Sequence, residues 1–448
     1  MENKDYTNYN FSEDDFVLVQ NKERIFDTAL STKPTTFIKD AFKRFCKNKS
    51  SVVAAFIIGI IVLVSLIVPV ISPYSVKGNI REALLRPKLF EAGTGFWDGT
   101  EKIVGVAADP ETNLPLDLDN SIVKEAILSS KVYEVDGVLK IDYVYDKYVA
   151  IYGEVEKTVA TVNLNSYINK GWIKFDLENI DSFELLDDKS PVRGIVSITQ
   201  NADGKNIYTC LVSQYRELGY DFIPSYLFGT NVKGVDNVKL SFLGLQKSFV
   251  FAIVIAAICF TVGLLWGSIS GYFGGNVDLF MERFKDILGG VPTVVIVTLM
   301  RLNIGTDLWV FALALCITGW MGTASRTRTQ FYRFKGREYV LASRTLGASD
   351  IRLIFRHILP NALGTIVTST VLMIPGLIFT EASLSYLGLG LQGSDSFGTI
   401  LSQNQDYLGT YPALILFPAT IISLLMISFN LFGNGLRDAL NPSLKGSE

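Results

Sequence analysis

The stretch that decides the fold is "REYVLASRTLGASDIRLIFRHILPNALG", Arg337–Gly364, a basic segment that lies between two apolar runs. Its pattern predicts a short helix over Glu338–Ala348, which Gly347 breaks or bends. Ser349-Asp350 can then cap a second helix, and Pro360 marks the start of the next apolar span. The first helix is too short and too polar to be buried in a membrane, so we expect it at a membrane surface.

On both sides of this segment the chain has the composition of a membrane protein. Hydrophobic residues make up 49% of its 448 residues and charged residues only 19%, which is below the share in globular domains. Uncharged runs of about twenty residues, long enough to cross a bilayer as helices, lie at Val52–Ile71, Phe249–Ile269, Leu308–Ala324, Ala362–Thr380 and Tyr411–Phe432. A shorter run at Gly290–Leu302 reaches full length only with the amphipathic stretch Asp278–Leu288 before it. The sequence therefore predicts an all-α polytopic membrane protein with six transmembrane helices.

Lysine and arginine predict the orientation, because they concentrate in the short cytoplasmic connections of membrane proteins. They are dense before the first span and in the loop 326–361, whereas Ser383–Thr410 contains none. We therefore expect a multi-pass protein of the cell membrane with both termini in the cytoplasm. The predicted parts are a cytoplasmic tail at 1–50, a first transmembrane helix at 51–72, an extracytoplasmic region at 73–245, a core with five transmembrane helices at 246–436 and a cytoplasmic tail at 437–448.

Most of the long extracytoplasmic region has a different pattern from the rest of the chain. Lys131–Val155, Gly171–Leu186 and Gly194–Tyr215 alternate apolar and polar residues as β-strands do. Acidic residues are frequent from about 91 to 223. We expect a small, acidic, β-rich domain of roughly 130 residues there, which is a usual size for one domain.

Several kinds of site are not indicated by the sequence. The 4 cysteines form no pair that suggests a disulfide bridge or a metal site. No G-x-x-x-x-G-K-[ST] loop occurs, so we expect no nucleotide or other cofactor on this chain. The β-rich region has no histidine and no G-x-S-x-G elbow. We therefore predict no catalytic residue, no metal ligand and no nucleic-acid partner.

From the residues alone, the basic segment has two interpretations. Its first helix offers a face of small and apolar side chains, flanked by arginines, that suits docking into a groove on a soluble partner: Leu341, Ala342, Thr345 and Leu346. Alternatively, it is a basic loop whose arginines only fix the topology and contact lipid headgroups.

The segment "EYVLASRTLGASDIRLIFRHILPN", Glu338–Asn361, resembles the cytoplasmic loop motif of ABC-importer permeases, in the version found in dipeptide and oligopeptide importers. Gly347–Asp350 and His357–Asn361 match the motif, whereas Leu341–Ser343 stands where the motif has E-A-A. Other stretches that resemble the family follow in the expected order: "YLFGTNVKGVD" (226–236), "GYFGGNVDLFMERFKDILGGVP" (271–292), "EASLSYLGLG" (381–390) and "NLFGNGLRDALNP" (430–442). The resemblance covers about 50–88 and 224–442 and is strongest to the second permease subunit of the peptide-importer heterodimer.

The resemblance implies the ABC type I importer permease fold, with the β-rich domain inserted after the first span. It also implies that the short helix seats in a cleft on an ATPase subunit. The residues of this predicted coupling loop are Glu338, Leu341, Ala342, Ser343, Arg344, Thr345, Leu346, Gly347, Ala348, Ser349, Asp350 and Pro360. The implied partners are a homologous permease, two ABC ATPase subunits that bind ATP and Mg²⁺, an extracytoplasmic peptide-binding protein or lipoprotein, and the peptide itself. No substrate-binding residue is identified.

Other functions remain open at this stage. Related permeases with the same motifs import nickel or another small solute. An ion-coupled secondary transporter usually needs ionisable groups at mid-membrane, and the five long predicted spans contain none. Glu381 falls at the outer end of the fifth span, where contact with a peptide amino terminus competes with polar packing at a helix end. A membrane-anchored receptor or enzyme would need only one span.

Overall fold

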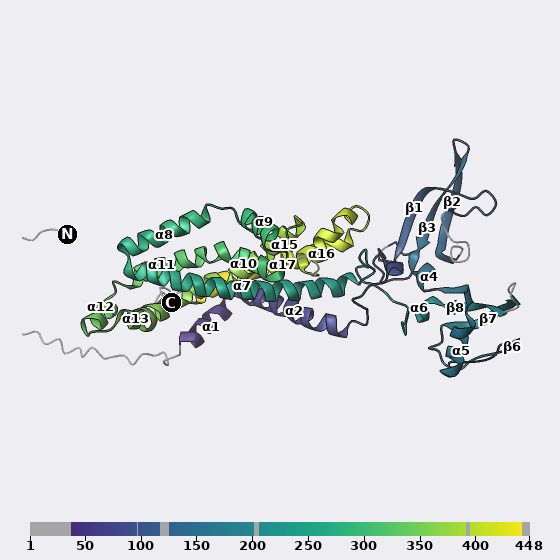
Figure 1. Ribbon diagram of the computed structural model, residues 1–448, viewed down its shortest axis with the longest axis horizontal. Coiled ribbons are helices and arrows are strands. Elements are labelled where there is room, and N and C mark those ends of the chain that lie inside the picture. The colour runs from purple at the N-terminus through teal and green to yellow at the C-terminus, as the bar shows by residue number, and fades with distance from the viewer. Residues whose placement is uncertain (1–36, 96, 117–124, 201–205, 391–394, 441–448) are drawn as a thin grey trace, which may run out of the picture.

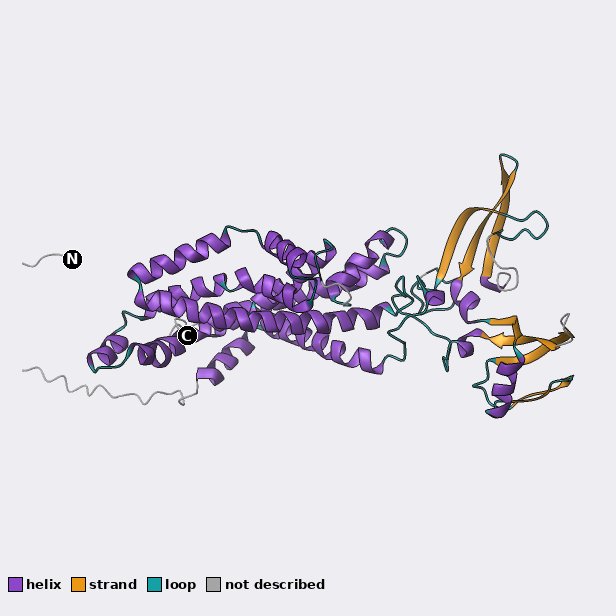
Figure 2. Ribbon diagram, viewed as in Figure 1, coloured by secondary structure: helices purple, strands orange, loops and turns teal. Residues whose placement is uncertain are grey.

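The computed structural model describes residues 37–440, apart from residue 96 and the segments 117–124, 201–205 and 391–394. Most of the predicted N-terminal tail and the end of the predicted C-terminal tail therefore lie outside the described residues. A bundle of helices forms one part of the molecule and the strands form the other (Figures 1 and 2). We call the end of the bundle that faces the strands the β end, and the opposite end the loop end.

Five helical stretches of the described chain are long and apolar enough to cross a membrane. They are Lys49–Ile71 (α2), Asn237–Phe273 (α7), Leu308–Phe334, Asp350–Tyr386 and Ala413–Leu440 (α17). The third consists of α10 (Leu308–Gly319) and α11 (Met321–Phe334), and the fourth contains α14 (Leu359–Val371) and α15 (Met373–Tyr386). Each predicted long span lies within one of these stretches, apart from the first residues of the last one. Helix α7 begins before residue 246, and α17 continues beyond residue 437.

The predicted sixth span is a broken one. Its residues form α8 (Gly275–Gly289) and α9 (Thr293–Asn303), which are bent by 72° relative to each other. Pro292 occupies the break, where its missing N–H and its effect on the preceding residue favour the end of one helix and the start of another. Counted as one span, the pair completes the six predicted crossings.

Helices α7 and α11 pack backbone against backbone through Gly263, Gly267 and Gly271, which follow one another at every fourth position of α7. A methyl group added at Gly267 would lie 2.3 Å from the carbonyl oxygen of Ala324. The corresponding distances are 2.7 Å from Gly263 to the oxygen of Trp320 and 2.8 Å from Gly271 to that of Arg328. Since lipid provides no hydrophobic drive between helices, such close packing of small residues is a main source of their association.

The β-rich region confirms the predicted class. Its described strands form three antiparallel sheets, in the orders β1-β3-β2, β4-β8-β7 and β5-β6. The strands are β1 (Thr100–Ala107), β2 (Ile127–Val135), β3 (Val138–Asp146), β4 (Glu154–Val159), β5 (Ile173–Asp176), β6 (Asn179–Leu185), β7 (Val192–Gln200) and β8 (Asn206–Ser213). The first two sheets have separate small cores, around Ile141 and around Leu164. The region is therefore built from two small units rather than one sheet.

One part of the predicted strand pattern is helical. The stretch after β3 forms α4 (Lys147–Tyr152), because Asp146 caps it by accepting a hydrogen bond from the backbone N–H of Tyr148 at 2.9 Å. Residues 148–152 form an unbroken apolar and aromatic run, which periodicity alone cannot assign to a strand or to a helix.

A buried carboxylate joins the β-rich region to the bundle. Glu82 is 2% exposed and accepts hydrogen bonds from Tyr152 on α4 at 2.6 Å, from Tyr220 at 3.2 Å and from Tyr226 at 3.3 Å. Burial is the main cause that raises the pKa of Tyr220 to about 12, so its hydroxyl stays protonated and can donate to Glu82. Because an unsatisfied buried carboxylate is costly, this cluster favours one placement of α4 against the start of the bundle.

A second contact lies closer to α17. The hydroxyl of Tyr411, just before α17, donates to Glu101 on β1 at 3.2 Å, and the guanidinium of Arg86 lies 5.4 Å from the Tyr411 ring. The β-rich region is thus fixed at two places rather than tethered by its chain ends.

The packing of α7 on α11 gives a stability prediction. Gly267→Ala should force the two backbones apart and lower the free energy of unfolding by about 1–3 kcal/mol, the usual cost of overpacking. The measurement is the thermal unfolding of the detergent-solubilised protein. Gly322→Ala on α11 is the matched control, since nothing lies within 4 Å of its added methyl group. Equal stability of the two variants would contradict this view of the interface.

Candidate functional site

The basic segment lies at the loop end of the bundle (Figure 1). It contains α12 (Glu338–Thr345), α13 (Asp350–Arg352) and a π-helical stretch, Leu353–Ile358, that leads into α14. Gly347 has φ +84°, a left-handed conformation that glycine adopts without strain, so the predicted break is present. The first helix ends at Thr345, earlier than the predicted Ala348, because the chain turns there.

Two predicted features of the second helix have a different structural basis from the one expected. Ser349 occupies the N-cap position, but its side chain makes no capping hydrogen bond. Pro360 lies in the first turn of α14, directly after the π-helical stretch. Because a proline ring crowds the carbonyl group four residues before it, a wider turn at this point relieves the clash.

The small and apolar face predicted for the first helix lies on the surface. Val340, with 0% exposure, packs against Leu353 and Phe331 and holds α12 to the bundle. Leu346 is 87% exposed, and Leu341, Ala342 and Thr345 are exposed as well. A contiguous group of exposed apolar side chains next to charged ones is typical of a surface that binds another protein.

Tyr272, near the loop end of α7, contacts the basic segment on both sides of Gly347. Its hydroxyl donates to the carboxylate of Asp350 and accepts a hydrogen bond from Nη2 of Arg344 at 3.2 Å. The Arg344 guanidinium also lies 5.6 Å from the centre of the Tyr272 ring. No local pattern in the sequence marks Tyr272, because its partners are more than seventy positions away along the chain.

An ion pair joins α7, α8 and α11 nearby. Nε and Nη2 of Arg328 lie 2.6 and 2.5 Å from the two carboxylate oxygens of Asp278, in the two-pronged geometry that arginine favours. Tyr332 donates to the same carboxylate at 2.8 Å, and Ser270 of α7 donates to it too. Arg328, counted in the sequence only as a topology signal, therefore has a structural partner.

At the β end, Glu381 of α15 is held by hydroxyl groups. It has 0% exposure, and its carboxylate accepts hydrogen bonds from Ser248 at 2.9 Å, Ser385 at 3.0 Å and Ser396 at 2.7 Å. Ser396 immediately precedes α16 (Phe397–Asn404). Of the two roles considered for Glu381, the structure shows polar packing, and this packing joins α7, α15 and α16.

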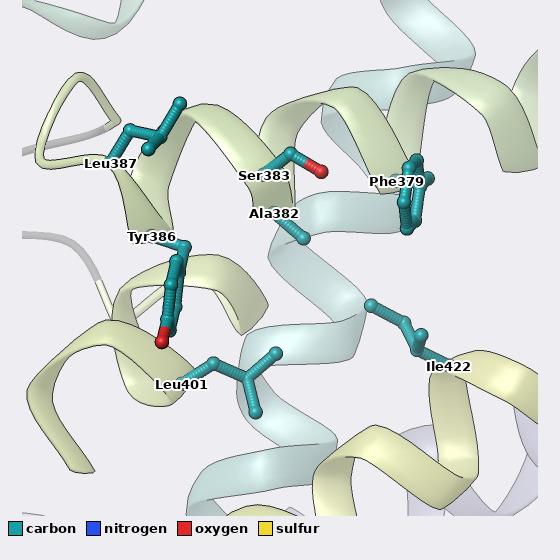
Figure 3. A pocket seen from close by; sticks show the side chains of 7 residues that line it. All are labelled: Phe379, Ala382, Ser383, Tyr386, Leu387, Leu401 and Ile422. Carbon is teal, nitrogen blue, oxygen red and sulfur yellow. The ribbon is translucent and has the colours of Figure 1, made fainter. Parts of the chain in front are cut away.

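An open apolar pocket of about 350 Å³ lies beside this cluster. Phe379, Tyr386, Leu401 and Ile422 line it, from α15, α16 and α17 (Figure 3). No group of three or more histidine, cysteine, aspartate or glutamate side chains within the described residues is arranged to hold a metal ion.

Comparisons with known proteins agree with the motifs. Residues 263–446 match the family described as "Binding-protein-dependent transport system inner membrane component", and residues 36–87 match the "N-terminal TM domain of oligopeptide transport permease C". The oligopeptide transport system permease protein OppC of Bacillus subtilis is 43% identical over 231 residues, which cover 51% of this chain and 76% of that protein. The chain therefore belongs to the family of OppC- and DppC-type permease subunits of ABC importers.

Two further comparisons concern a second relative and the solved structures. The dipeptide transport system permease protein DppC of Lactococcus lactis is 36% identical over 229 residues, which cover 51% of this chain and 67% of that protein. The alignment with a chain of an inward-facing structure of the MetNI methionine ABC transporter covers 45% of this chain and 96% of that chain, with 17% identity and a TM-score of 0.39.

Membership of the permease family has one direct consequence. A permease subunit is a membrane-embedded transport component and not an ATPase, as the sequence predicted.

The cluster around Glu381 gives a second prediction. Glu381→Leu should leave three serine hydroxyls without their acceptor and lower the free energy of unfolding by about 3 kcal/mol. Glu381→Gln keeps a carbonyl acceptor and should cost less. Thermal unfolding in detergent compares the two variants with Ser383→Ala, which changes a hydroxyl on the same helix outside the cluster. Equal effects of Leu and Gln would show that the hydrogen bonds contribute little.

Proposed function

We propose that this protein is one of the two transmembrane subunits of an ATP-driven importer for oligopeptides or dipeptides. The observation that carries the proposal is the exposed face of α12, presented beside the left-handed turn at Gly347 in a chain of this family. The names of the relatives support a peptide as the transported solute, rather than nickel or another small solute. The other transmembrane subunit is a homologous permease.

In this proposal the loop end of the bundle faces the cytoplasm and the β-rich region lies outside the cell. The high density of lysine and arginine in 326–361 and before α2 supports this orientation. Glu338, residues 341–350 and Pro360 then form the coupling loop, which docks on an ATPase subunit that binds ATP and Mg²⁺. Two such ATPases serve the pair of permeases.

Transport follows from a shift between two arrangements of the bundle. Closure of the ATPases around ATP moves α12. The helices of the bundle then move, so that the cavity between the two permeases opens to the other side of the membrane. The apolar pocket at α15, α16 and α17 contributes the wall of this cavity in our subunit. Hydrolysis of ATP resets the arrangement.

The β-rich region recruits the peptide-binding protein. Acidic side chains outnumber basic ones from 91 to 223, so a basic face on the binding protein would be attracted to it. Because Glu82 and Tyr411 fix the region to the bundle, it holds a captured binding protein at a defined place above the pathway.

Docking of α12 on the ATPases is tested by co-purification. Ala342→Glu places a charge in the middle of the exposed face and should abolish co-purification of the ATPase subunits with the tagged permease, because the buried charge finds no partner. Gly336→Glu is the control, since this exposed glycine precedes α12 and nothing lies within 4 Å of a Cβ atom added to it. Retention of the ATPases by Ala342→Glu would contradict the proposed docking surface.

The role of the β-rich region is tested by deletion. Lys88 and Tyr226 are joined by a backbone hydrogen bond of 2.9 Å, so a short Gly-Ser linker from Phe90 to Pro224 should close the chain without strain. We expect association with the binding protein to become about tenfold slower and to lose its dependence on salt concentration.

A second variant separates charge from shape in this test. Glu178→Gln with Asp181→Asn neutralises two exposed acids around the β5-β6 turn and should reduce association less than the deletion does. Unchanged binding and uptake after the deletion would mean that recruitment is the wrong role for the region.

A further inference from the structure

The two helices on either side of Gly347, α12 and α13, are joined through the hydroxyl group of Tyr272. Arg344 lies in the last turn of α12 and Asp350 begins α13, so Gly347 separates them. The Tyr272 hydroxyl binds both, as acceptor from Arg344 at 3.2 Å and as donor to Asp350. Tyr272 is only 6% exposed, and its ring packs in the same cluster as Val340 and Leu353.

The position of the Tyr272 hydroxyl limits how α12 can move relative to α13. Glycine in a left-handed conformation with no atom within 4 Å of its added Cβ gives the turn little resistance of its own. The packing of Val340 is not directional, so without a further link α12 could turn about Gly347 while α13 and the bundle stay in place. The hydroxyl of Tyr272 supplies that link, because both of its partners are charged and hydrogen bonds to charged groups are among the stronger ones.

We propose that Tyr272 is the positioning residue of the coupling step: it clamps α12 and α13 to the end of α7, so that movement of α12 moves α7. This inference rests on the proposed function. It names a residue outside the loop motif as the point where the movement enters the bundle.

Helix α7 is suited to carry such a movement. It extends without a break from Asn237 to Phe273, and Gly263, Gly267 and Gly271 bind it closely to α11 next to Tyr272. Lys335, directly after α11, donates to the carbonyl oxygen of Gly271 at 2.9 Å and closes the same contact from the other side. At its opposite end, Nζ of Lys239 donates to the carbonyl oxygen of Ser72 at 3.1 Å, just beyond α2.

The test uses the full complex of both permeases, the ATPases and the binding protein, reconstituted in liposomes. Tyr272→Phe removes the hydroxyl and keeps the ring. We expect complex yield and thermal stability to stay within about twofold and a few degrees of the wild type, while ATP hydrolysed per peptide imported rises about tenfold. Tyr407→Phe, in the connection between α16 and α17, is the control, since its hydroxyl has no hydrogen bond within the described residues and the ratio should not change.

A double variant keeps the inference testable if complex yield falls. If the clamp acts through Asp350, Tyr272→Phe should change the number of ATP molecules hydrolysed per peptide much less in an Asp350→Asn background than in the wild type. Parallel loss of ATPase and import rates at an unchanged ratio would assign Tyr272 a purely structural role and overturn the inference.

The same experiment distinguishes this inference from the proposed function. A wild-type complex that imports no peptide on ATP would refute the proposed function whatever Tyr272 does. A wild-type complex that couples normally, together with a Tyr272→Phe complex of the same ratio, would refute the clamp alone.

Discussion

The rest of the bundle depends on the contact of α7 with α11, where Gly263, Gly267 and Gly271 let two backbones approach closely. In water the hydrophobic effect would drive such an association, but between helices in lipid it offers almost nothing, and close van der Waals packing must supply the free energy. The same contact fixes the position of α7, and of the side chains that it carries, relative to α11. Helix α7 has 37 residues and extends from the attachment of the β-rich region at one end to the basic segment at the other.

Three buried carboxylates fix the ends of the bundle in a similar way. Glu82 is bound by tyrosine hydroxyls, Glu381 by serine hydroxyls, and Asp278 by Arg328 with hydroxyl groups beside it. A buried carboxylate without partners is costly, so each of these groups favours the arrangement in which all its donors are in place. Each also joins segments that are distant in the chain. The apolar packing holds the helices together along their length, and the carboxylates specify how their ends meet.

The sequence predicted those features that depend on local composition. Runs of uncharged residues predicted the long spans, and a break in the helix at Gly347 was expected because glycine interrupts a helical pattern. What the sequence could not reveal were bonds between distant positions, such as those of Tyr272 with Arg344 and Asp350, because no local pattern marks a hydroxyl that binds two partners of another segment. Likewise, alternation predicted strands in the β-rich region but not its division into separate sheets, since alternation shows which side chains share a face and not which strands pair.

The attachment of the β-rich region explains how a domain can interrupt the chain between α2 and α7 without disturbing the bundle. The two chain segments that lead into it and out of it are joined directly, by the backbone bond between Lys88 and Tyr226 and by the hydroxyl of Ser225 donating to the oxygen of Lys88 at 2.7 Å. These bonds hold the two segments together independently of the residues inserted between them. A passive insertion would need nothing more.

Here, however, further contacts extend from the insertion to α17. The ring of Trp97 packs edge-on against Phe228 at 5.4 Å between ring centres, and Phe228 stacks on Phe417 of α17 at 4.0 Å. Together with the bond from Tyr411 to Glu101, this aromatic series places the β-rich region in direct contact with a helix that lines the apolar pocket. Because α17 cannot shift relative to this region without breaking these contacts, they favour movement of the region together with the α17 side of the pocket.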